Sequence, residues 1–548
     1  MQHPANTVTV TDTHAHAHAQ AHTVRSSAFA VMRDFGATVL FGNPGSTELP
    51  MFRDFPADFQ YVLGLHESVV VGMADGYAQA NGRVAFVNLH SAAGVGNAMG
   101  NIHTAFKNRT PMVIIAGQQS RSILPFDPYL ASDEATELPK PYVKWSVQPA
   151  RAEDVPQAIA TACHRALQAP CGPVLVSVPA DDWDRPAQAV AHRIVSRGAR
   201  PDPALLVDIA AHLARSERPA FVVGAEVDRD GAWEAAVQLA ERHDAAVWAA
   251  PMAARAGFPE NHPLFMGFLP AAREQIVARL AAHDLVMVIG APVFTYHVEG
   301  EGPHLSPGAA LFQLTEDAAA AARAPLGTSL VASVRLALQD LLAVPGQAPD
   351  LTRPPRPLPP VRVAPARVLP SEPLDVAYVM QTLADLRRPS DIIVEEAPTA
   401  RIVMQARLPI LQPGTFLTMA SGGLGYGMPA AAGVAMARPG QRVIGLIGDG
   451  SSMYSIQTLW TAAQLGLNMT FVVLNNRRYA ALKRFGGLLG FAPDAVLPGT
   501  ELPGLDFVGL AEAQGCRASR VTTADALRPA VEAALAASGP TLVEVVIA

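Results

Sequence analysis

The chain has 548 residues, half of them apolar, and a formal net charge of −7 at pH 7. This length provides for several domains of ordinary size, and a mildly acidic chain without a basic stripe is not expected to bind nucleic acid. The longest apolar runs are too short to span a bilayer, so no membrane partner is expected. Three cysteines in so long a chain predict a reducing, cytoplasmic location without a disulfide framework.

The beginning of the chain is polar and rich in histidine. It lacks the basic region and apolar core of a secretory signal. Its histidines, which could capture a transition metal, are His14, His16, His18 and His22. Low complexity favours the other interpretation, a disordered tail over residues 1–23.

Apolar, strand-like runs alternate with helical stretches in three segments, at 24–195, 200–344 and 374–548. This alternation predicts an α/β fold with three domains, each a doubly wound parallel sheet with helices on both faces. Residues 345–373 are dense in proline, so we expect a semi-rigid linker over the surface. The central segment lacks a Gly-x-Gly-x-x-Gly fingerprint, and we infer no dinucleotide from it.

A glutamate begins one predicted helix of the first segment. Glu67 is followed by largely apolar residues up to residue 80, so its carboxylate is expected among buried side chains. A buried carboxylate needs a partner, or its pKa rises until it is neutral. The alternative is a glutamate in the first turn, favoured there by the helix dipole.

The most informative motif is Gly448-Asp449-Gly450-Ser451, which is followed later by Asn475-Asn476. The apolar run that leads into the first motif predicts a buried strand, 453–465 a helix, and 469–474 the next buried strand. In such a βαβ unit the carboxyl ends of both strands are neighbours, so the two motifs should lie close together. Oxygen ligands beside a helix N-terminus suit Mg²⁺ and phosphate groups. The pattern predicts a Mg²⁺–diphosphate site.

These motifs together resemble those of the thiamine-diphosphate enzymes. From about Val24 onward the chain most resembles the benzoylformate decarboxylases, which belong to the 2-oxo-acid decarboxylase and acetolactate synthase-like superfamily. The resemblance rests on stretches such as FGNPGSTELP, HESVVVGMADGYAQA, NLHSAAGVGNAMG, SGGLGYGMPAAAGV and GDGSSMYSIQTLWTAAQ. The resemblance implies a pyrimidine-binding, a central Rossmann-like and a diphosphate-binding domain. It also implies thiamine diphosphate with Mg²⁺ (or Ca²⁺ in the same site), no FAD, and a homodimer or homotetramer whose active site lies at the subunit interface.

The resemblance assigns roles to individual residues. The catalytic residues would be Glu67, which would hydrogen-bond N1′ of the aminopyrimidine, the proton-transferring His90 and His297, and Ser46, which would contact the substrate carboxylate. The cofactor-binding positions are Glu67, Thr399, Gly422, Leu424, Gly448, Asp449, Gly450, Ser451, Asn476 and Tyr479. The substrate pocket comprises Ser46, Tyr129, Leu130, Thr418, Ala481 and Phe485, and the metal ligands are Asp449, Asn476 and the carbonyl of Arg478.

Three positions depart from the family pattern. Arg477-Arg478 stands where the family usually has glycine followed by threonine or glycine, and a positive φ would strain Arg477. Thr418 stands where a large aromatic residue is usual in the pocket, and Pro398-Thr399 replaces a pair of hydroxyl residues. These changes leave the cofactor prediction intact and leave the substrate side chain open.

The implied activity is non-oxidative decarboxylation of an aromatic 2-oxo acid, benzoylformate to benzaldehyde and CO₂, through a thiamine-diphosphate ylide and enamine, as in the mandelate pathway of aromatic catabolism. One alternative is an acetolactate synthase-type carboligase, or a decarboxylase of another 2-oxo acid. The sequence His-Ser-Ala-Ala-Gly at His90 disfavours the carboligase. A second alternative is a non-catalytic cofactor-binding subunit, which the presence of Glu67, Asp449, Asn476 and both histidines disfavours.

Overall fold

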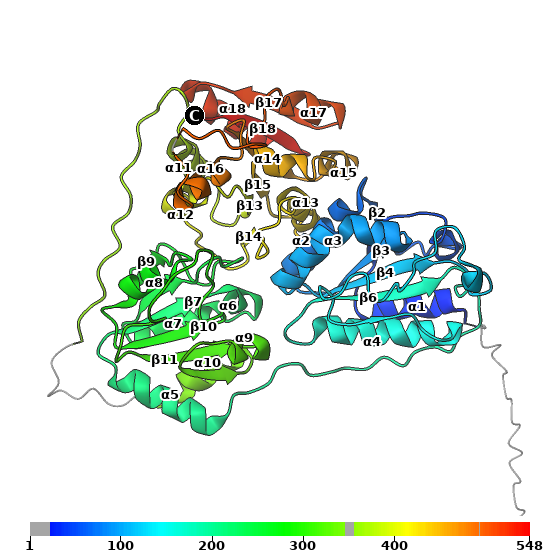
Figure 1. Cartoon of the computed structure of the whole chain (residues 1–548), viewed down its shortest axis with the longest axis horizontal. Helices are drawn as coiled ribbons and strands as arrows, with labels where there is room; N and C mark the ends of the chain where they lie inside the picture. The colour runs from blue at the N-terminus through cyan, green and yellow to red at the C-terminus, as the bar shows by residue number, and fades with distance from the viewer. Residues whose placement is uncertain (1–21, 346–355, 493) are drawn as a thin grey trace, which may run out of the picture.

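The computed structural model describes residues 22–345, 356–492 and 494–548. They form three lobes, coloured blue to cyan, green, and yellow to red in Figure 1. Each lobe is built on a six-stranded sheet, and all pairings between its described strands are parallel. The predicted fold class is therefore confirmed. Residues 1–21 of the predicted tail and 346–355 of the predicted linker lie outside the described residues.

The N-terminal domain has the strand order β2-β1-β3-β4-β6-β5. Its central strands β3 and β4 are buried at every residue, as expected where helices cover both faces. Its strands are β1 (Val39–Asn43), β2 (Gln60–Leu63), β3 (Ala85–Leu89), β4 (Met112–Gln118), β5 (Ser146–Val147) and β6 (Pro173–Pro179). Its helices are α1 (Val24–Asp34), α2 (Glu67–Asn81), α3 (Ser91–Asn108) and α4 (Val155–Leu167).

The central domain has the order β12-β11-β10-β7-β8-β9, with β7 and β10 fully buried at its middle. Its strands are β7 (Pro219–Val223), β8 (Ala246–Ala249), β9 (Phe265–Phe268), β10 (Leu285–Ile289), β11 (Ala310–Thr315) and β12 (Thr328–Val331). Its helices are α5 (Pro203–Arg215), α6 (Ala225–Arg229), α7 (Trp233–Arg242), α8 (Arg273–Leu280), α9 (Ala318–Ala322) and α10 (Val334–Ala343).

The C-terminal domain has the order β14-β13-β15-β16-β18-β17. Its strands are β13 (Ile392–Glu396), β14 (Phe416–Thr418), β15 (Val443–Gly448), β16 (Met469–Asn475), β17 (Arg517–Val521) and β18 (Thr541–Val546). Its helices are α11 (Val376–Leu386), α12 (Arg401–Arg407), α13 (Gly427–Ala437), α14 (Asp449–Met453), α15 (Thr458–Gln464), α16 (Ala480–Leu488), α17 (Phe507–Ala513) and α18 (Ala524–Ala536).

The connection between β15 and β16 differs from its prediction. A single helix over 453–465 was expected, but α14 ends at Met453 and α15 begins only at Thr458. The intervening residues 454–457 contain neither glycine nor proline, so the sequence carries no signal for this break. The first helix begins directly after the strand and includes the whole predicted diphosphate motif except Gly448.

The described part of the linker, residues 356–373, contains no helix or strand and runs along the outside of the molecule (Figure 1). Arg367 forms an ion pair with Asp385 at 2.7 Å, and Arg407 donates a hydrogen bond to the carbonyl of Ala366. These contacts fasten the linker to the C-terminal domain. None of the helices in the described ranges combines the length and the apolar character needed to cross a bilayer.

Helices α2 and α13 cross at the centre of the molecule (Figure 1), and glycines allow their backbones to meet. A Cβ atom on Gly76 would lie 2.1 Å from the carbonyl oxygen of Ala430. A Cβ atom on Gly433 would lie 1.9 Å from the carbonyl oxygen of Met73. Only a hydrogen atom fits at either position. The crossing fixes α2, which begins at Glu67, against the domain that carries the metal motif.

Arg255 of the central domain joins all three domains. Its guanidinium donates to the backbone carbonyl of Gln79 in α2 at 2.7 Å and to the carboxylate of Asp228 at 2.6 Å. Asp228 in turn accepts from the backbone N–H of Gly414, in the C-terminal domain, at 2.8 Å. Since Arg255 is buried, these charge-assisted bonds are shielded from water.

The helix crossing predicts that a single methyl group destabilises the protein. Gly76→Ala should lower the free energy of unfolding by about 1–3 kcal/mol or more, because the backbones of α2 and α13 must separate. Gly440→Ala is the control, since a Cβ atom there meets nothing within 4 Å. The midpoint of chemical denaturation measures both. Equal midpoints for the two variants would contradict the proposed close packing.

Candidate active site

The metal motif lies at the carboxyl ends of β15 and β16, as predicted. The two strands pair in parallel as far as Gly448 and Leu474, and Asp449 follows as the first residue of α14. Oδ1 of Asp449 accepts from the N–H of Gly450 at 2.8 Å, whereas Oδ2 is buried without a hydrogen-bond partner among the described residues. Burial raises the pKa of this carboxyl group, and the N–H groups of Gly450 and residues 476–478 oppose the rise. A buried carboxylate oxygen without a partner fits a cation.

The loop after β16 adopts the strained geometry that its sequence suggested. Arg477 has a φ of +59°, in the region that favours glycine. The N–H of Arg477 donates to the side chain of Asn475 at 3.0 Å, and its carbonyl accepts from Leu502 at 2.8 Å. Tyr479 donates from its backbone to Thr500 at 2.7 Å. These bonds hold the half-buried Asn476 beside Asp449, while the role of the Arg478 carbonyl stays a prediction.

The glycine between Asp449 and Ser451 has a structural reason. A Cβ atom on Gly450 would lie 2.2 Å from the ring of Tyr479, so the ring packs directly on the glycine backbone. Ser451 is buried next to it. The loop after β16 thus contacts the first motif through the side chain of Tyr479, which lies on the backbone of that motif.

Glu396 organises the loop that contains Gly422 and Leu424, and sequence analysis missed it. It lies fully buried at the end of β13 and accepts hydrogen bonds from the N–H groups of Gly425, at 2.6 Å, and Gly427. Burial raises its pKa to about 7, while these N–H groups act in the opposite direction. Gly422 has a φ of +75°, and Leu424 packs partly buried against the core. The available signal was a pair of acids that ends an apolar run.

Thr418 lies in a buried polar network at the edge of the same sheet. Its hydroxyl donates to Glu395 at 2.9 Å and accepts from Arg401 at 2.7 Å. Arg401 and Glu395 also form an ion pair at 2.6 Å. Because the hydroxyl is engaged within the domain, the assignment of Thr418 to the substrate pocket stays a prediction.

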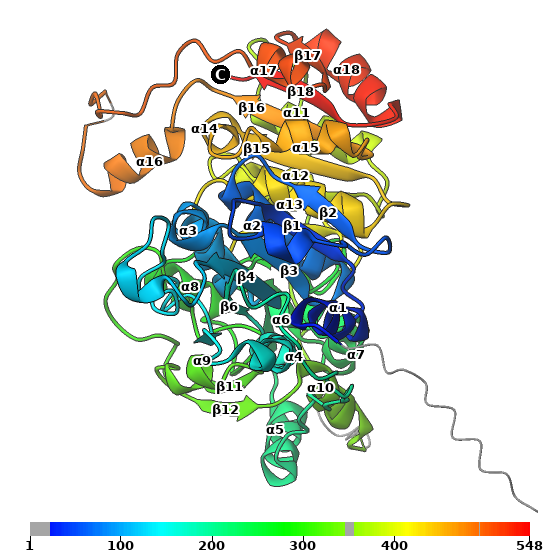
Figure 2. The ribbon, with the colours of Figure 1, turned by 90° about the vertical axis from the view of Figure 1, so that its right-hand side faces the viewer.

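His297 of the central domain contacts the C-terminal domain. Its ring lies 4.6 Å from the ring of Phe485 in α16, the helix that also carries Ala481. Figure 2 shows α16 standing out from the C-terminal sheet. Arg484 of this helix donates to the carbonyl of the half-buried Thr399 at 2.9 Å. The structure therefore assembles His297, Phe485 and Thr399 within one chain.

Glu67 lies at the open end of a helix, and its predicted burial is wrong for the single chain. The residue is half-buried because it is the first residue of α2, and its role toward a cofactor stays a prediction. His66 caps the helix by accepting from the N–H of Ser68 at 3.1 Å. Asn97 of α3 donates to the Glu67 carboxylate at 3.1 Å. The rest of the carboxylate is available to a ligand.

His90 is held by a glutamate that sequence analysis missed. Nδ1 of His90 lies 2.9 Å from the carboxylate of Glu48, which also accepts from the N–H of Gly45 at 2.8 Å and from Thr47 at 2.7 Å. A carboxylate acceptor requires hydrogen on Nδ1 and leaves Nε2 for a substrate. A Cβ atom on Gly45 would lie 2.2 Å from the imidazole, so this glycine makes room for the ring. The signal was an acid two residues after Ser46.

The predicted site forms two half-sites in one chain. Among the described residues, no hydrogen bond, ion pair or ring contact joins Ser46, Glu67 or His90 to the metal motif or to His297. The loop with Leu130, whose φ is +66°, leaves Tyr129 87% exposed. Large apolar side chains of both half-sites are also exposed, namely Ile123, Phe126, Leu482, Leu488, Leu489 and Phe491.

Comparison with protein families matches all three domains. Residues 22–136 match the N-terminal TPP binding domain of the thiamine pyrophosphate enzymes, 206–341 their central domain and 399–545 their C-terminal TPP binding domain. Benzoylformate decarboxylase of Pseudomonas aeruginosa is 46% identical over 95% of this chain and 98% of its own length. Acetolactate synthase large subunit of Corynebacterium glutamicum is 28% identical over 92% of this chain and 83% of its own.

Comparison with solved structures finds proteins of the same fold. Benzoylformate decarboxylase from Polynucleobacter necessarius superimposes with a TM-score of 0.92 at 39% identity, covering 96% of this chain and 98% of that one. The thiamine diphosphate-dependent 4-hydroxybenzoylformate decarboxylase of Rhodococcus jostii gives a TM-score of 0.91 at 41% identity, covering 96% and 99%.

The unpartnered oxygen of Asp449 predicts a cation-dependent site. Asp449→Asn should weaken Mg²⁺-dependent binding of thiamine diphosphate by at least about tenfold, because the amide removes the charge and preserves the shape. Titration of the cofactor by calorimetry, with and without Mg²⁺, measures this. Asp525→Asn, which changes an exposed carboxylate of α18, is the matched control. Unchanged Mg²⁺ dependence in the Asp449 variant would show that the cation binds elsewhere.

Proposed function

The chain belongs to the thiamine pyrophosphate enzyme family, and we propose that it decarboxylates an aromatic 2-oxo acid, benzoylformate or a ring-substituted relative, to the aldehyde and CO₂. The near full-length similarity to benzoylformate decarboxylases is the observation that carries this proposal. The pairing of His90 with Glu48 supports it, because it provides an oriented imidazole beside Ser46.

The residues of this chain fit the cofactor. When bound, thiamine diphosphate supplies the carbanion that adds to the keto carbon and the electron sink for loss of the carboxylate. Asp449, Asn476 and the carbonyl of Arg478 would hold Mg²⁺ against the diphosphate, and the buried Oδ2 of Asp449 supports this. Among the described residues no three His, Cys, Asp or Glu side chains form a metal cluster, so an amide and a carbonyl are the expected additional ligands.

Other cofactor contacts follow from the same arrangement. Glu67 would share a proton with the aminopyrimidine nitrogen, and Asn97 would hold its carboxylate in place. The loop with Gly422 and Leu424, fixed by Glu396, would pack against the rings of the cofactor. The positive φ of Gly422 lets the backbone approach a ligand without a side chain.

Side chains of the protein would donate and accept the protons of the reaction. Nε2 of His90 would give a proton to the oxygen of the former keto group and take it back when the aldehyde leaves. Ser46 would orient the substrate carboxylate. His297, packed on Phe485, would supply the proton that replaces CO₂ on the substrate carbon. Each role requires both half-sites in one place.

We therefore propose that two copies of the chain complete each active site. The separate half-sites and the exposed apolar side chains of both support at least a homodimer, with a homotetramer as the larger form. Cys163, Cys171 and Cys516 are free, which supports the prediction of a cytoplasmic, reducing location.

A substrate panel tests the proposed activity. With Mg²⁺ and thiamine diphosphate, we expect CO₂ and benzaldehyde from benzoylformate at a rate well above that with phenylpyruvate, a branched-chain 2-oxo acid or pyruvate. Aldehyde and acetolactate are measured in the same samples. Acetolactate formed from pyruvate faster than any aldehyde would assign the chain to the carboligases. Absence of CO₂ release from all four acids by cofactor-loaded protein would indicate a non-catalytic subunit.

The role of Glu48 gives a separate prediction. Glu48→Gln should lower kcat at least tenfold, towards the roughly 10²–10⁴-fold that a positioned acid–base group contributes, because His90 loses its orientation. Cofactor affinity and KM should change little, and Glu48→Asp should restore part of kcat. Glu153→Gln, an exposed glutamate of the same domain, is the control. A loss confined to KM would assign Glu48 to substrate binding instead.

A further inference from the structure

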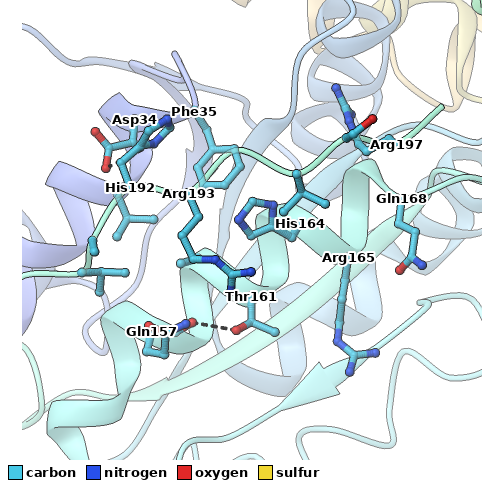
Figure 3. A pocket seen from close by; sticks show the side chains of 16 residues that line it. Asp34, Phe35, Gln157, Thr161, His164, Arg165, Gln168, His192, Arg193 and Arg197 are labelled. Carbon is cyan, nitrogen blue, oxygen red and sulfur yellow. Dashed lines mark hydrogen bonds and ion pairs between the residues drawn. The ribbon is translucent and has the colours of Figure 1, made fainter.

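A separate cavity lies on the N-terminal domain, and none of its lining residues belongs to the candidate active site. Its volume is about 410 Å³, within the range of small-molecule sites. It lies between α1, α4 and the extended segment 190–197 (Figure 3). This segment leads from β6 to α5, so one wall of the cavity is the connection to the central domain.

Basic side chains dominate the polar lining of this cavity. They come from two directions, with His164 and Arg165 on α4 and His192, Arg193 and Arg197 on the connecting segment. Asp34 is the one acid among the lining residues. A concentration of positive charge is unexpected in a chain with a net charge of −7, and it creates a local attraction for anions.

The positive charges are only partly neutralised by the protein. Arg193 has no hydrogen bond or ion pair among the described residues. Arg197 donates to the carbonyl of Leu167 at 3.2 Å and lies near Glu316, where burial raises the pKa of the carboxyl group and the charge of Arg197 opposes the rise. Asp34 lies 3.8 Å from His192, and Figure 3 shows both on the opposite side of the cavity from Arg197. Burial lowers the pKa of His164, and the charges of Arg193, Arg197 and His192 lower it further. The cations therefore repel one another across the cavity.

The uncharged polar residues of the lining are Gln157, Thr161, Gln168 and Ser196, and the rest of the lining is apolar. The ring of Phe35 packs edge-on against His164 at a centroid distance of 5.0 Å. Val31 and Ala160 of the helices and Val190 and Val195 of the connecting segment complete the apolar surface. An inorganic anion would satisfy the arginines and leave this surface exposed to water. A ligand with an anionic head and an apolar body would satisfy both.

We propose that this cavity binds a small organic carboxylate with an apolar ring or branched chain. The carboxylate lies between Arg193 and Arg197, whose guanidinium groups match its geometry, and the apolar body lies against Phe35 and the valines. A bound molecule would join α4 to the connecting segment. The proposal is independent of the decarboxylase assignment, since it uses none of the residues of that site.

Binding stoichiometry tests the proposal. Holoenzyme is titrated with 4-fluorobenzoate, and sites per chain are counted by calorimetry and ¹⁹F NMR, because the active site can also accept an aromatic acid. We expect wild-type protein to show one more site per chain than Arg193→Ser/Arg197→Ser, and Arg185→Ser, an exposed neighbour outside the cavity, to match wild type. Benzyl alcohol should not compete at the additional site, and higher ionic strength should weaken it.

Several outcomes would overturn the proposal. Equal stoichiometry and affinity in wild type and the double variant would show that no such site exists. Displacement of 4-fluorobenzoate by inorganic phosphate at equal concentration would show an unspecific anion site. Equal competition by benzyl alcohol would remove the role of the arginines. Decarboxylation and thermal midpoint are measured on the same samples, so a folding defect or a failed activity assignment is recognised separately.

Discussion

The backbone contact between α2 and α13 is the constraint on which the rest of this structure depends. Gly76 and Gly433 bring carbonyl groups of one helix to the Cα atoms of the other, a distance that no side chain permits. α2 begins with Glu67, and α13 follows the loop that contains Leu424. The crossing therefore sets the relative positions of the two half-sites of one chain before any ligand binds.

Side chains on one face of helix α3 also hold the N-terminal and C-terminal domains together. Asn97 bonds the carboxylate of Glu67, and Asn101 donates to the carbonyl of Gly425 at 3.1 Å. The hydroxyl of Thr104 lies 2.8 Å from that of Ser421. These positions repeat with helical spacing, so they share one face of the helix. One helix thus holds a catalytic candidate of the N-terminal domain and the cofactor loop of the C-terminal domain in a fixed relation.

The hydrogen-bond partners of three buried carboxylates distinguish structural roles from ligand sites. Glu396 is satisfied by two backbone N–H groups and shapes a loop. Glu48 is satisfied by Gly45, Thr47 and His90 and orients an imidazole. Asp449 retains a buried oxygen with no partner among the described residues. Since a buried charged oxygen without a partner is costly, it marks where a ligand belongs.

The sequence alone determined the fold class, because buried parallel strands are continuous apolar runs whose order in the chain alternates with helices. It also located Asp449 and Asn476 at neighbouring strand ends, since right-handed βαβ connections have one geometry. Tertiary structure alone decided that Glu67 is half-buried instead of buried and that Glu48 holds His90. It alone revealed that His297 reaches Phe485 and that basic side chains of two distant segments line one cavity. These contacts join residues far apart in the chain, and local pattern carries no information about which distant surfaces will meet.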